Sequence, residues 1–321
     1  MHTRTLLVAL CVGIASLGAQ AQAWPAKPIR IIASTAAGGA PDILARIVAN
    51  RMAERLGQGI IVDLKPGAGG VIAADALVRA PADGYTWLLS TTTILAVTPH
   101  LRRSLPYDTQ RDLLPISLIA STANVLLVGK HVAAASTAEL VALVKKNPGR
   151  ITYGSAGIGS PAHLAGELFA TLAGAAMTHV SYKGAALALN DVAGGQIDMI
   201  MTSPVAAKAF LQGDKVRALA TTGAERDPQF AQLPPVADAL PGYEITQWWG
   251  LVVKAGTPAA IVERVHAELT ATLAEPKIRD LIAAQGALAR PMKRDQFAAF
   301  IVRERDRYAD LVKRAKVPME D

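Results

Sequence analysis

The most constraining feature of the sequence is a pair of strand–glycine–helix openings, at residues 31–44 and 151–164. Each is a short apolar run followed by small and hydroxylated residues, and then by a proline, Pro41 or Pro161, where a helix is expected to begin. A helix N-terminus carries unpaired N–H groups and a partial positive charge, so it can hold an anion without a cationic side chain. Two such openings in different halves of the chain predict a ligand held between two lobes.

The N-terminal residues predict a secretory signal. Residues 1–5 are positively charged, residues 6–17 are apolar but too short to span a bilayer, and residues 21–23 form a small-x-small cleavage signal. We therefore expect residues 1–23 to be removed and the mature chain to be periplasmic. Cys11, the only cysteine, would leave with the signal, and the remaining chain is long enough to build a core without disulfides.

The charge distribution argues against nucleic acid as a partner. The net charge is +7, but basic and acidic residues alternate over residues 293–314, which is typical of a solvated helix face. Aromatic residues make up only 5% of the chain, too few for base-stacking platforms. An anionic small ligand is the better explanation of the basic balance.

Helical and strand patterns alternate along the chain and predict an α/β fold with largely parallel sheets. We expect strands at 29–33, 60–62, 85–90, 113–120, 124–128, at Ile151, and at 179–182, 197–201, 216–221 and 245–253. We expect helices at 42–56, from about 70 to 79, at 137–146 and 162–172, from about 185, and at 259–274 and 294–313. Residues 121–123 separate two apolar runs and suit a crossing between lobes, and residues 245–253 should return to the first lobe.

Other chemistries find little support in the motifs. The two Gly-x-Gly turns have Ile72 and Ala162 where a dinucleotide fingerprint needs glycine. Tyr153 stands two residues before Ser155, where a nucleophile elbow has glycine, and His163 with Glu167 is the one helical pair worth considering as a metal site. We expect no cofactor, no metal and no catalytic residue. A periplasmic hydrolase or isomerase that uses Ser155, His163 and Asp42 is the alternative from a different class.

The openings themselves favour a carboxylate. Neither contains lysine or arginine, and Ser160 suits the N-cap of the second helix. Asp42, in a first helical turn, either orients a water or a ligand amino group or simply caps the helix. His163 either donates to a carboxylate or holds its loop. Lys183 is either a counter-charge for the ligand or an exposed loop lysine.

Motifs along nearly the whole mature chain carry a resemblance to a known family. They are Trp24-Pro25, Gly38-Gly39-x-x-Asp42, Lys65-Pro66-Gly67-Ala68-Gly69-Gly70, Ala82-Asp83-Gly84-Tyr85-Thr86, Gly157-x-Gly159-Ser160-x-x-His163-Leu164-Ala165, Tyr182-Lys183-Gly184, Trp249-Gly250 and Ala255-Gly256-Thr257-Pro258. In their order and number, these motifs resemble the solute-binding receptors of the tripartite tricarboxylate transporter family, the Bug proteins.

The resemblance implies a type II periplasmic-binding-protein fold: two α/β lobes joined by two crossing strands, with a ligand cleft between them. It places lobe 1 at residues 24–122 and 244–321 and lobe 2 at residues 123–243. It also implies a receptor without catalytic activity that closes on a small carboxylate and presents it to membrane transporter subunits. We expect a monomer. A sensor that presents its ligand to a signalling receptor is the alternative among binding proteins.

These expectations define a set of candidate ligand-binding residues. On lobe 1 they are Thr35, Ala37, Gly38, Gly39, Pro41, Asp42, Ser90, Thr91 and Thr92. On lobe 2 they are Gly157, Gly159, Ser160, His163, Tyr182, Lys183, Thr202, Ser203 and Pro204.

Overall fold

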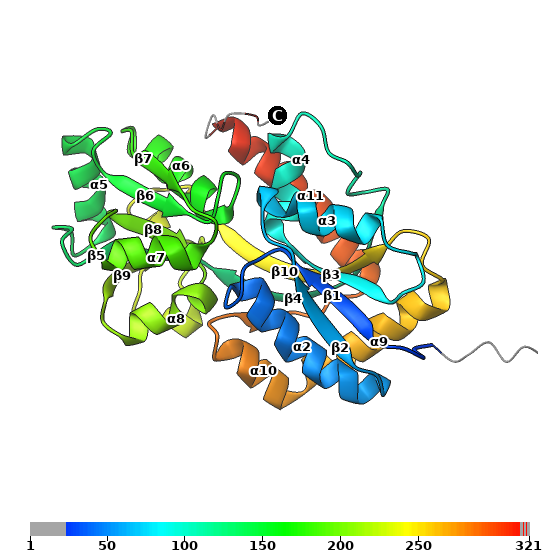
Figure 1. The fold of residues 1–321 in the computed structure, drawn as a ribbon. Helices are drawn as coiled ribbons and strands as arrows, with labels where there is room; N and C mark the ends of the chain where they lie inside the picture. The colour runs from blue at the N-terminus through cyan, green and yellow to red at the C-terminus, as the bar shows by residue number, and fades with distance from the viewer. Residues whose placement is uncertain (1–23, 315–316, 318, 320–321) are drawn as a thin grey trace, which may run out of the picture.

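The computed structural model describes residues 24–314, 317 and 319, and arranges them in two α/β lobes, each built on one sheet (Figure 1). The expected signal at residues 1–23 lies outside the described residues. Lobe 1 has a six-stranded sheet in the order β11-β4-β10-β3-β1-β2, and lobe 2 has a five-stranded sheet in the order β7-β6-β8-β5-β9. The predicted two-lobed α/β fold is confirmed.

The bounds of the elements are as follows. The strands of lobe 1 are β1 (Ile29–Ala33), β2 (Ile60–Leu64), β3 (Thr86–Thr91), β4 (Leu113–Ala123), β10 (Thr246–Lys254) and β11 (Leu288–Ala289). Those of lobe 2 are β5 (Val125–Gly129), β6 (Thr152–Ser155), β7 (Thr178–Ser181), β8 (Met199–Thr202) and β9 (Val216–Thr221). The α-helices are α2 (Ala40–Leu56), α3 (Val71–Val78), α4 (Thr98–Leu101), α5 (Thr137–Lys146), α6 (Pro161–Ala173), α7 (Ala185–Ala193), α8 (Pro204–Gln212), α9 (Ala259–Ala274), α10 (Pro276–Ala283) and α11 (Arg294–Arg314).

Both sheets are mixed, so the expectation of largely parallel sheets is wrong. β1 is parallel to β2 and β3, and β6 is parallel to β7 and β8, but β10 is antiparallel to β3 and β4, and β5 is antiparallel to β8 and β9. The reason is the route of the chain. β5 enters its sheet from lobe 1 and β10 enters its sheet from lobe 2. Each therefore begins at the edge of its sheet where the neighbouring strands end, and is antiparallel to them.

The chain passes between the lobes twice. β4 ends at Ala123 and β5 begins at Val125, so the first crossing is at Asn124, one residue beyond the expected segment. The second crossing lies within residues 222–245, and β4 and β10 then pair over the length between the lobes (Figure 1). The lobe boundaries at 122/123 and 243/244 remain a prediction.

The apolar core is continuous between the lobes. Adjacent residues of β3 face opposite sides: Leu89 packs in a cluster with residues of α2, α9 and α10, whereas Leu88 packs with residues of α3 and α11. The cluster that holds Leu88 also contains Leu126 of β5 and Leu164 of α6, so it extends into lobe 2. A separate cluster lies beneath α7 and α8. The lobes therefore pack directly against each other.

The C-terminal helix differs from expectation in one respect. The charged residues of α11, Glu304 included, were predicted to lie on a solvated helix face, yet Glu304 is buried. It accepts a hydrogen bond from the indole N–H of Trp248 (2.8 Å) and pairs with Arg307 (3.0 Å). Because Trp248 belongs to β10, this network fixes the last helix to a strand that runs between the lobes.

Among the described residues, three α- or π-helical segments were not predicted. A π-helical turn at Thr93–Val97 continues into α4, α8 follows β8 directly, and α10 separates the two helices expected at the end of the chain. These segments are short, and α8 and α10 each begin with a proline that sequence analysis did not interpret as a helix start. Among the described residues, no helix is both long enough and apolar enough to span a membrane.

Candidate functional site

The topology brings the carboxyl ends of two sets of strands to facing edges. β4 is parallel to β3 and leads into lobe 2, so β1, β3 and β4 end at the edge of their sheet nearest lobe 2. β9 leads back to lobe 1, and β6 and β8 run in the same direction as β9. In open α/β sheets ligands bind outside the carboxyl ends of strands. The two facing edges are therefore the candidate site.

On lobe 1, the loop between β1 and α2 is shaped by glycine and by one carboxylate. Gly38 has φ +78°, a left-handed conformation suited to glycine, and a Cβ on Gly39 would lie 2.1 Å from Oγ1 of Thr35. Asp42 is buried, and its carboxylate accepts hydrogen bonds from the Gly38 N–H (2.9 Å) and from Nε of Arg46 (2.6 Å). Asp42 therefore holds the loop and is paired within its own helix. Ala37 is exposed and Pro41 lies in the first turn of α2.

The hydroxyl cluster Ser90–Thr92 at the end of β3 is buried, and its three members have different roles. Thr91 Oγ1 accepts from the Ile94 N–H (3.3 Å) and so begins the π-helical turn. Thr92 Oγ1 accepts from the backbone N–H of Trp248 (2.9 Å), which ties the end of β3 to β10. Ser90 Oγ is fully buried and has no hydrogen-bond partner among the described residues.

On lobe 2, the loop between β6 and α6 is held by its own side chains. Ser160 caps α6, accepting from the His163 N–H (3.3 Å), so the predicted N-cap is confirmed. The Gly159 N–H donates to Nδ1 of His163 (3.1 Å). Ser155 Oγ lies 3.1 Å from the Gly157 nitrogen, which donates to it. The N-terminus of α6 is thereby fixed at the edge that faces lobe 1.

A buried aromatic and imidazole cluster supports this loop. The ring of His163 stacks on that of His179 with centroids 4.1 Å apart, and Nε2 of His179 lies 2.7 Å from Ser155 Oγ. Tyr153 stacks on His179 and hydrogen-bonds Glu167, whose Oε1 is also 3.9 Å from Nε2 of His163.

The imidazoles of this cluster are held neutral. Burial, followed by the neighbouring His179, lowers the pKa of His163 to about 4, and burial lowers the pKa of His179 to about 4. Because Nδ1 of His163 accepts a backbone N–H, its proton lies on Nε2. Burial and the bond to Glu167 raise the pKa of Tyr153. Thus His163 offers a neutral N–H donor and no positive charge.

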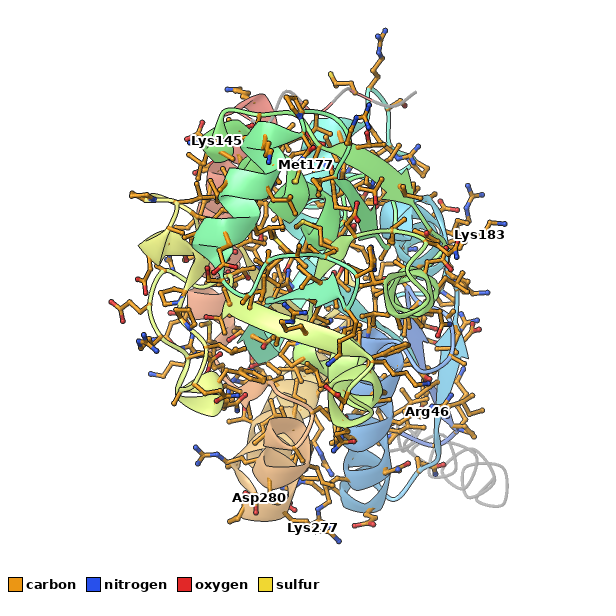
Figure 2. All side chains as sticks on the ribbon, turned by 90° about the vertical axis from the view of Figure 1, so that its left-hand side faces the viewer. Arg46, Lys145, Met177, Lys183, Lys277 and Asp280 are labelled. Atoms are coloured by element: carbon orange, nitrogen blue, oxygen red, sulfur yellow. The ribbon has the colours of Figure 1, made fainter. Side chains whose placement is uncertain are left out.

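The remaining predicted residues fall into two groups. Tyr182 donates to Asp191 (2.6 Å), and burial with this bond raises its pKa to about 12. Lys183, next to it, is exposed and projects from the surface in Figure 2, away from the body of the protein. Thr202, Ser203 and Pro204, by contrast, are buried at the end of β8, where Ser203 is the N-cap of α8.

Two features of the facing edges were missed by sequence analysis. His179 lies opposite Tyr153 in the β6–β7 pair, and Asn124 lies directly before β5, bonded to Thr222 at the end of β9. The signal for Asn124 is a polar residue directly before the apolar run 125–128, which sequence analysis had included in the strand. No comparable local signal marks His179, because its contacts come from a neighbouring strand.

The lobes touch at the candidate site. A Cβ on Gly159 would lie 2.4 Å from Cδ1 of Leu101, which belongs to lobe 1. Within lobe 2, the hydroxyl of Tyr243, on the segment that returns to lobe 1, donates to the carbonyl of Ala165 in α6 (3.0 Å). Two surface hollows, of about 320 and 630 Å³, lie elsewhere on lobe 1, beside α10 and beside the start of α11. Neither is lined by a predicted site residue.

No group of three histidine, cysteine or acidic residues suited to a metal is present in the described part of the chain.

Comparison with known proteins shows the family to which the chain belongs. The family model for receptors of the tripartite tricarboxylate transporter family matches residues 44–317. BugT of Bordetella pertussis is 32% identical over 319 residues, covering 98% of both chains. The chain therefore belongs to the tripartite tricarboxylate transporter receptor family, and the resemblance to Bug proteins is confirmed.

Solved structures extend the similarity to the fold. Rpa4515 of R. palustris, solved with adipate, has a TM-score of 0.89 at 32% identity, covering 92% of this chain and 99% of its own. MatC of Rhodopseudomonas palustris, solved with bound malate, has a TM-score of 0.84 at 29% identity, covering 90% of this chain and 100% of its own. These are carboxylate-bound proteins of the same architecture.

Proposed function

We propose that this chain is a periplasmic solute-binding receptor of a tripartite tricarboxylate-type transporter, without catalytic activity of its own. It captures a small carboxylate between the facing edges of the two lobes, and the closed form is presented to the membrane subunits as a monomer. Lobe 1 contributes the loop Thr35–Asp42 and Ser90–Thr92. Lobe 2 contributes Gly157–His163, Tyr182 and Thr202–Pro204, whereas Lys183, which projects away from the body of the protein, is not part of the proposed site.

One observation carries the proposal: the N-terminus of α6 is fixed at the facing edge by Ser160 and a neutral His163. Backbone N–H groups at a helix N-terminus bind carboxylates through the helix dipole and hydrogen bonds, without a formal cation. The relatives solved with adipate and malate support a carboxylate ligand. Asp42 is paired with Arg46 and Gly38, which argues against a role in holding a ligand amino group.

Isothermal titration of the mature chain, beginning at Trp24, tests the proposal against mono-, di- and tricarboxylates and amino acids. We expect at least one carboxylate to bind, and at a hundredfold excess over Kd to stabilise the protein by about 2.7 kcal/mol in urea unfolding. Lobe closure requires that the ligand bind the closed form better than the open one. A panel in which no carboxylate binds would overturn the proposal.

Two serine caps provide a matched pair of variants. Ser160→Ala removes the N-cap of α6. Ser136→Ala removes the N-cap of α5, where the hydroxyl of Ser136 accepts a hydrogen bond from the Glu139 N–H (3.2 Å). Each should cost about 1 kcal/mol of stability. Only the Ser160 variant should also weaken carboxylate binding, because α5 starts at another part of lobe 2. Equal affinities in the two variants would argue against a ligand at α6.

A further inference from the structure

Asn124 occupies the point where the chain first crosses between the lobes. Val125 pairs with Thr202 of β8 and with Thr221 of β9, so Asn124 lies one position further toward lobe 1, beside Thr222. These strand ends belong to the edge of lobe 2 that faces lobe 1. Asn124 is therefore at the base of the candidate site, where β8 and β9 end.

The backbone of Asn124 is held rigidly. Its N–H donates to Oγ1 of Thr222 (2.8 Å), and the Thr222 N–H donates to its carbonyl oxygen (2.8 Å). The same hydroxyl of Thr222 donates to the carbonyl of Ile245 (2.5 Å), on the returning segment of the chain. The backbone of Asn124 is thus tied, through Thr222, to both ends of the second connection between the lobes.

The side-chain amide of Asn124 is fully buried, yet neither Nδ2 nor Oδ1 has a hydrogen-bond partner among the described residues. By contrast, the buried hydroxyls of Thr92 and Thr222 are both bonded within the chain. A buried polar group without a partner lowers the stability of the fold, and an amide has both a donor and an acceptor to satisfy. A leucine of similar size would avoid this cost, so the amide calls for a polar partner from outside the chain.

The chemistry of the amide defines that partner. Nδ2 donates to a carboxylate oxygen, while Oδ1 accepts only from a donor, so a carboxylate alone satisfies half of the group. An ammonium group would satisfy Oδ1, but the buried carboxylate among the predicted site residues, Asp42, is already paired. A hydroxyl on the carbon next to the carboxyl group completes the pair without adding charge.

Resting on the receptor function proposed above, we infer that Asn124 selects a 2-hydroxycarboxylate. Nδ2 donates to the carboxylate of the ligand, and the hydroxyl of the ligand donates to Oδ1. A site built to hydrogen-bond a hydroxyl discriminates strongly against the analogue that lacks it, because its polar groups are then left without partners.

The experiment compares malate with succinate, which lacks only the hydroxyl, by isothermal titration on the wild type, Asn124→Leu, Asn124→Ala and the exposed control Asn190→Ala. We expect the wild type and the control to bind malate at least about tenfold more tightly than succinate. In both Asn124 variants this ratio should fall to about one, mainly through loss of malate affinity. An unchanged ratio in these variants, or a wild type that binds the two acids equally, overturns the inference while leaving the receptor function standing. A wild type that binds no carboxylate overturns the receptor function itself.

Stability of the ligand-free protein gives a second readout. Because Asn124→Leu removes an amide without partners, its urea midpoint should equal or exceed that of the wild type even though malate affinity is lost. A structural asparagine would give the opposite result, a lower midpoint together with equal losses for both acids, and that result contradicts the inference.

Discussion

Protonation of His163 should destabilise the folded protein as the pH falls. His163 is almost completely buried, its Nδ1 accepts the Gly159 N–H, and its ring stacks on His179. A proton on Nδ1 would remove the acceptor for Gly159 and place a charge beside a second imidazole. Glu167 lies 3.9 Å from Nε2 of His163 but accepts a hydrogen bond from Tyr153, so it offsets only part of the cost of the added positive charge.

The size of the effect follows from the pKa of His163, which is lowered from 6.5 to about 4 in the folded state. Between these two values the unfolded chain binds more protons than the folded one, so stability falls as the pH falls and the loss is complete only below about pH 4. At about pH 5 the loss relative to about pH 7.5 is about 2 kcal/mol from this residue. The more exposed His179 adds less, because solvent screens its charge.

Urea unfolding of the ligand-free protein at several pH values measures this loss. His163→Asn is the informative variant, because asparagine retains an acceptor for the Gly159 N–H but does not titrate. We expect its stability to decline less steeply between about pH 7.5 and pH 5 than that of the wild type, by about 2 kcal/mol over the range. The same substitution at the exposed His131 serves as the control. Parallel curves for the His163 variant and the wild type would refute the reasoning.

Three further substitutions test close contacts and a buried hydrogen bond. Gly159→Ala should weaken carboxylate binding about threefold to tenfold in titration calorimetry, since its Cβ would lie 2.4 Å from Leu101 of lobe 1, and Leu101→Ala in the same chain should restore part of the loss. Failure of that second change to help would argue against the contact as the cause. Glu304→Leu should lower stability by about 1–3 kcal/mol in urea, because it leaves the buried indole N–H of Trp248 without its acceptor, whereas the partly exposed Arg307 keeps Glu244; an unchanged urea midpoint would contradict this. Gly166→Ala should lower the Tm despite the better helix propensity of alanine, because its Cβ would lie 2.2 Å from the ring of Tyr153, and an unchanged Tm would show that the ring moves freely.

Local features of the site could be predicted from the sequence. The strand–glycine–helix openings gave the two loops, and Ser160 was correctly assigned as an N-cap because capping depends on residues only a few positions apart. The two-lobed fold also followed, although its mixed strand directions did not. Those directions depend on which edge of a sheet each crossing strand enters, and alternation of helices and strands carries no such information.

Contacts between distant residues could not be predicted. The Ser155–His179 pair arises from the β6–β7 register, and the burial of Glu304 depends on a tryptophan from another strand. The same limit applied to Asp42, whose two interpretations stood equal until its bonds to Gly38 and Arg46 were known. A single sequence shows the chemistry that each side chain offers but not which partner has already used it.

The place of β10 also bears on the order in which the protein assembles. All strands of the lobe 2 sheet come from one continuous segment, residues 125–221, whereas β10 lies between β3 and β4 and comes from residues 246–254. Both strands that flank β4 follow lobe 2 in the chain, so a polypeptide that emerges from its N-terminus exposes β4 as an unpaired strand for most of its synthesis. Such edges are open to pairing with other chains. Lobe 1 begins first and is completed last, and its unfinished sheet is the part of the nascent chain that most needs protection from aggregation.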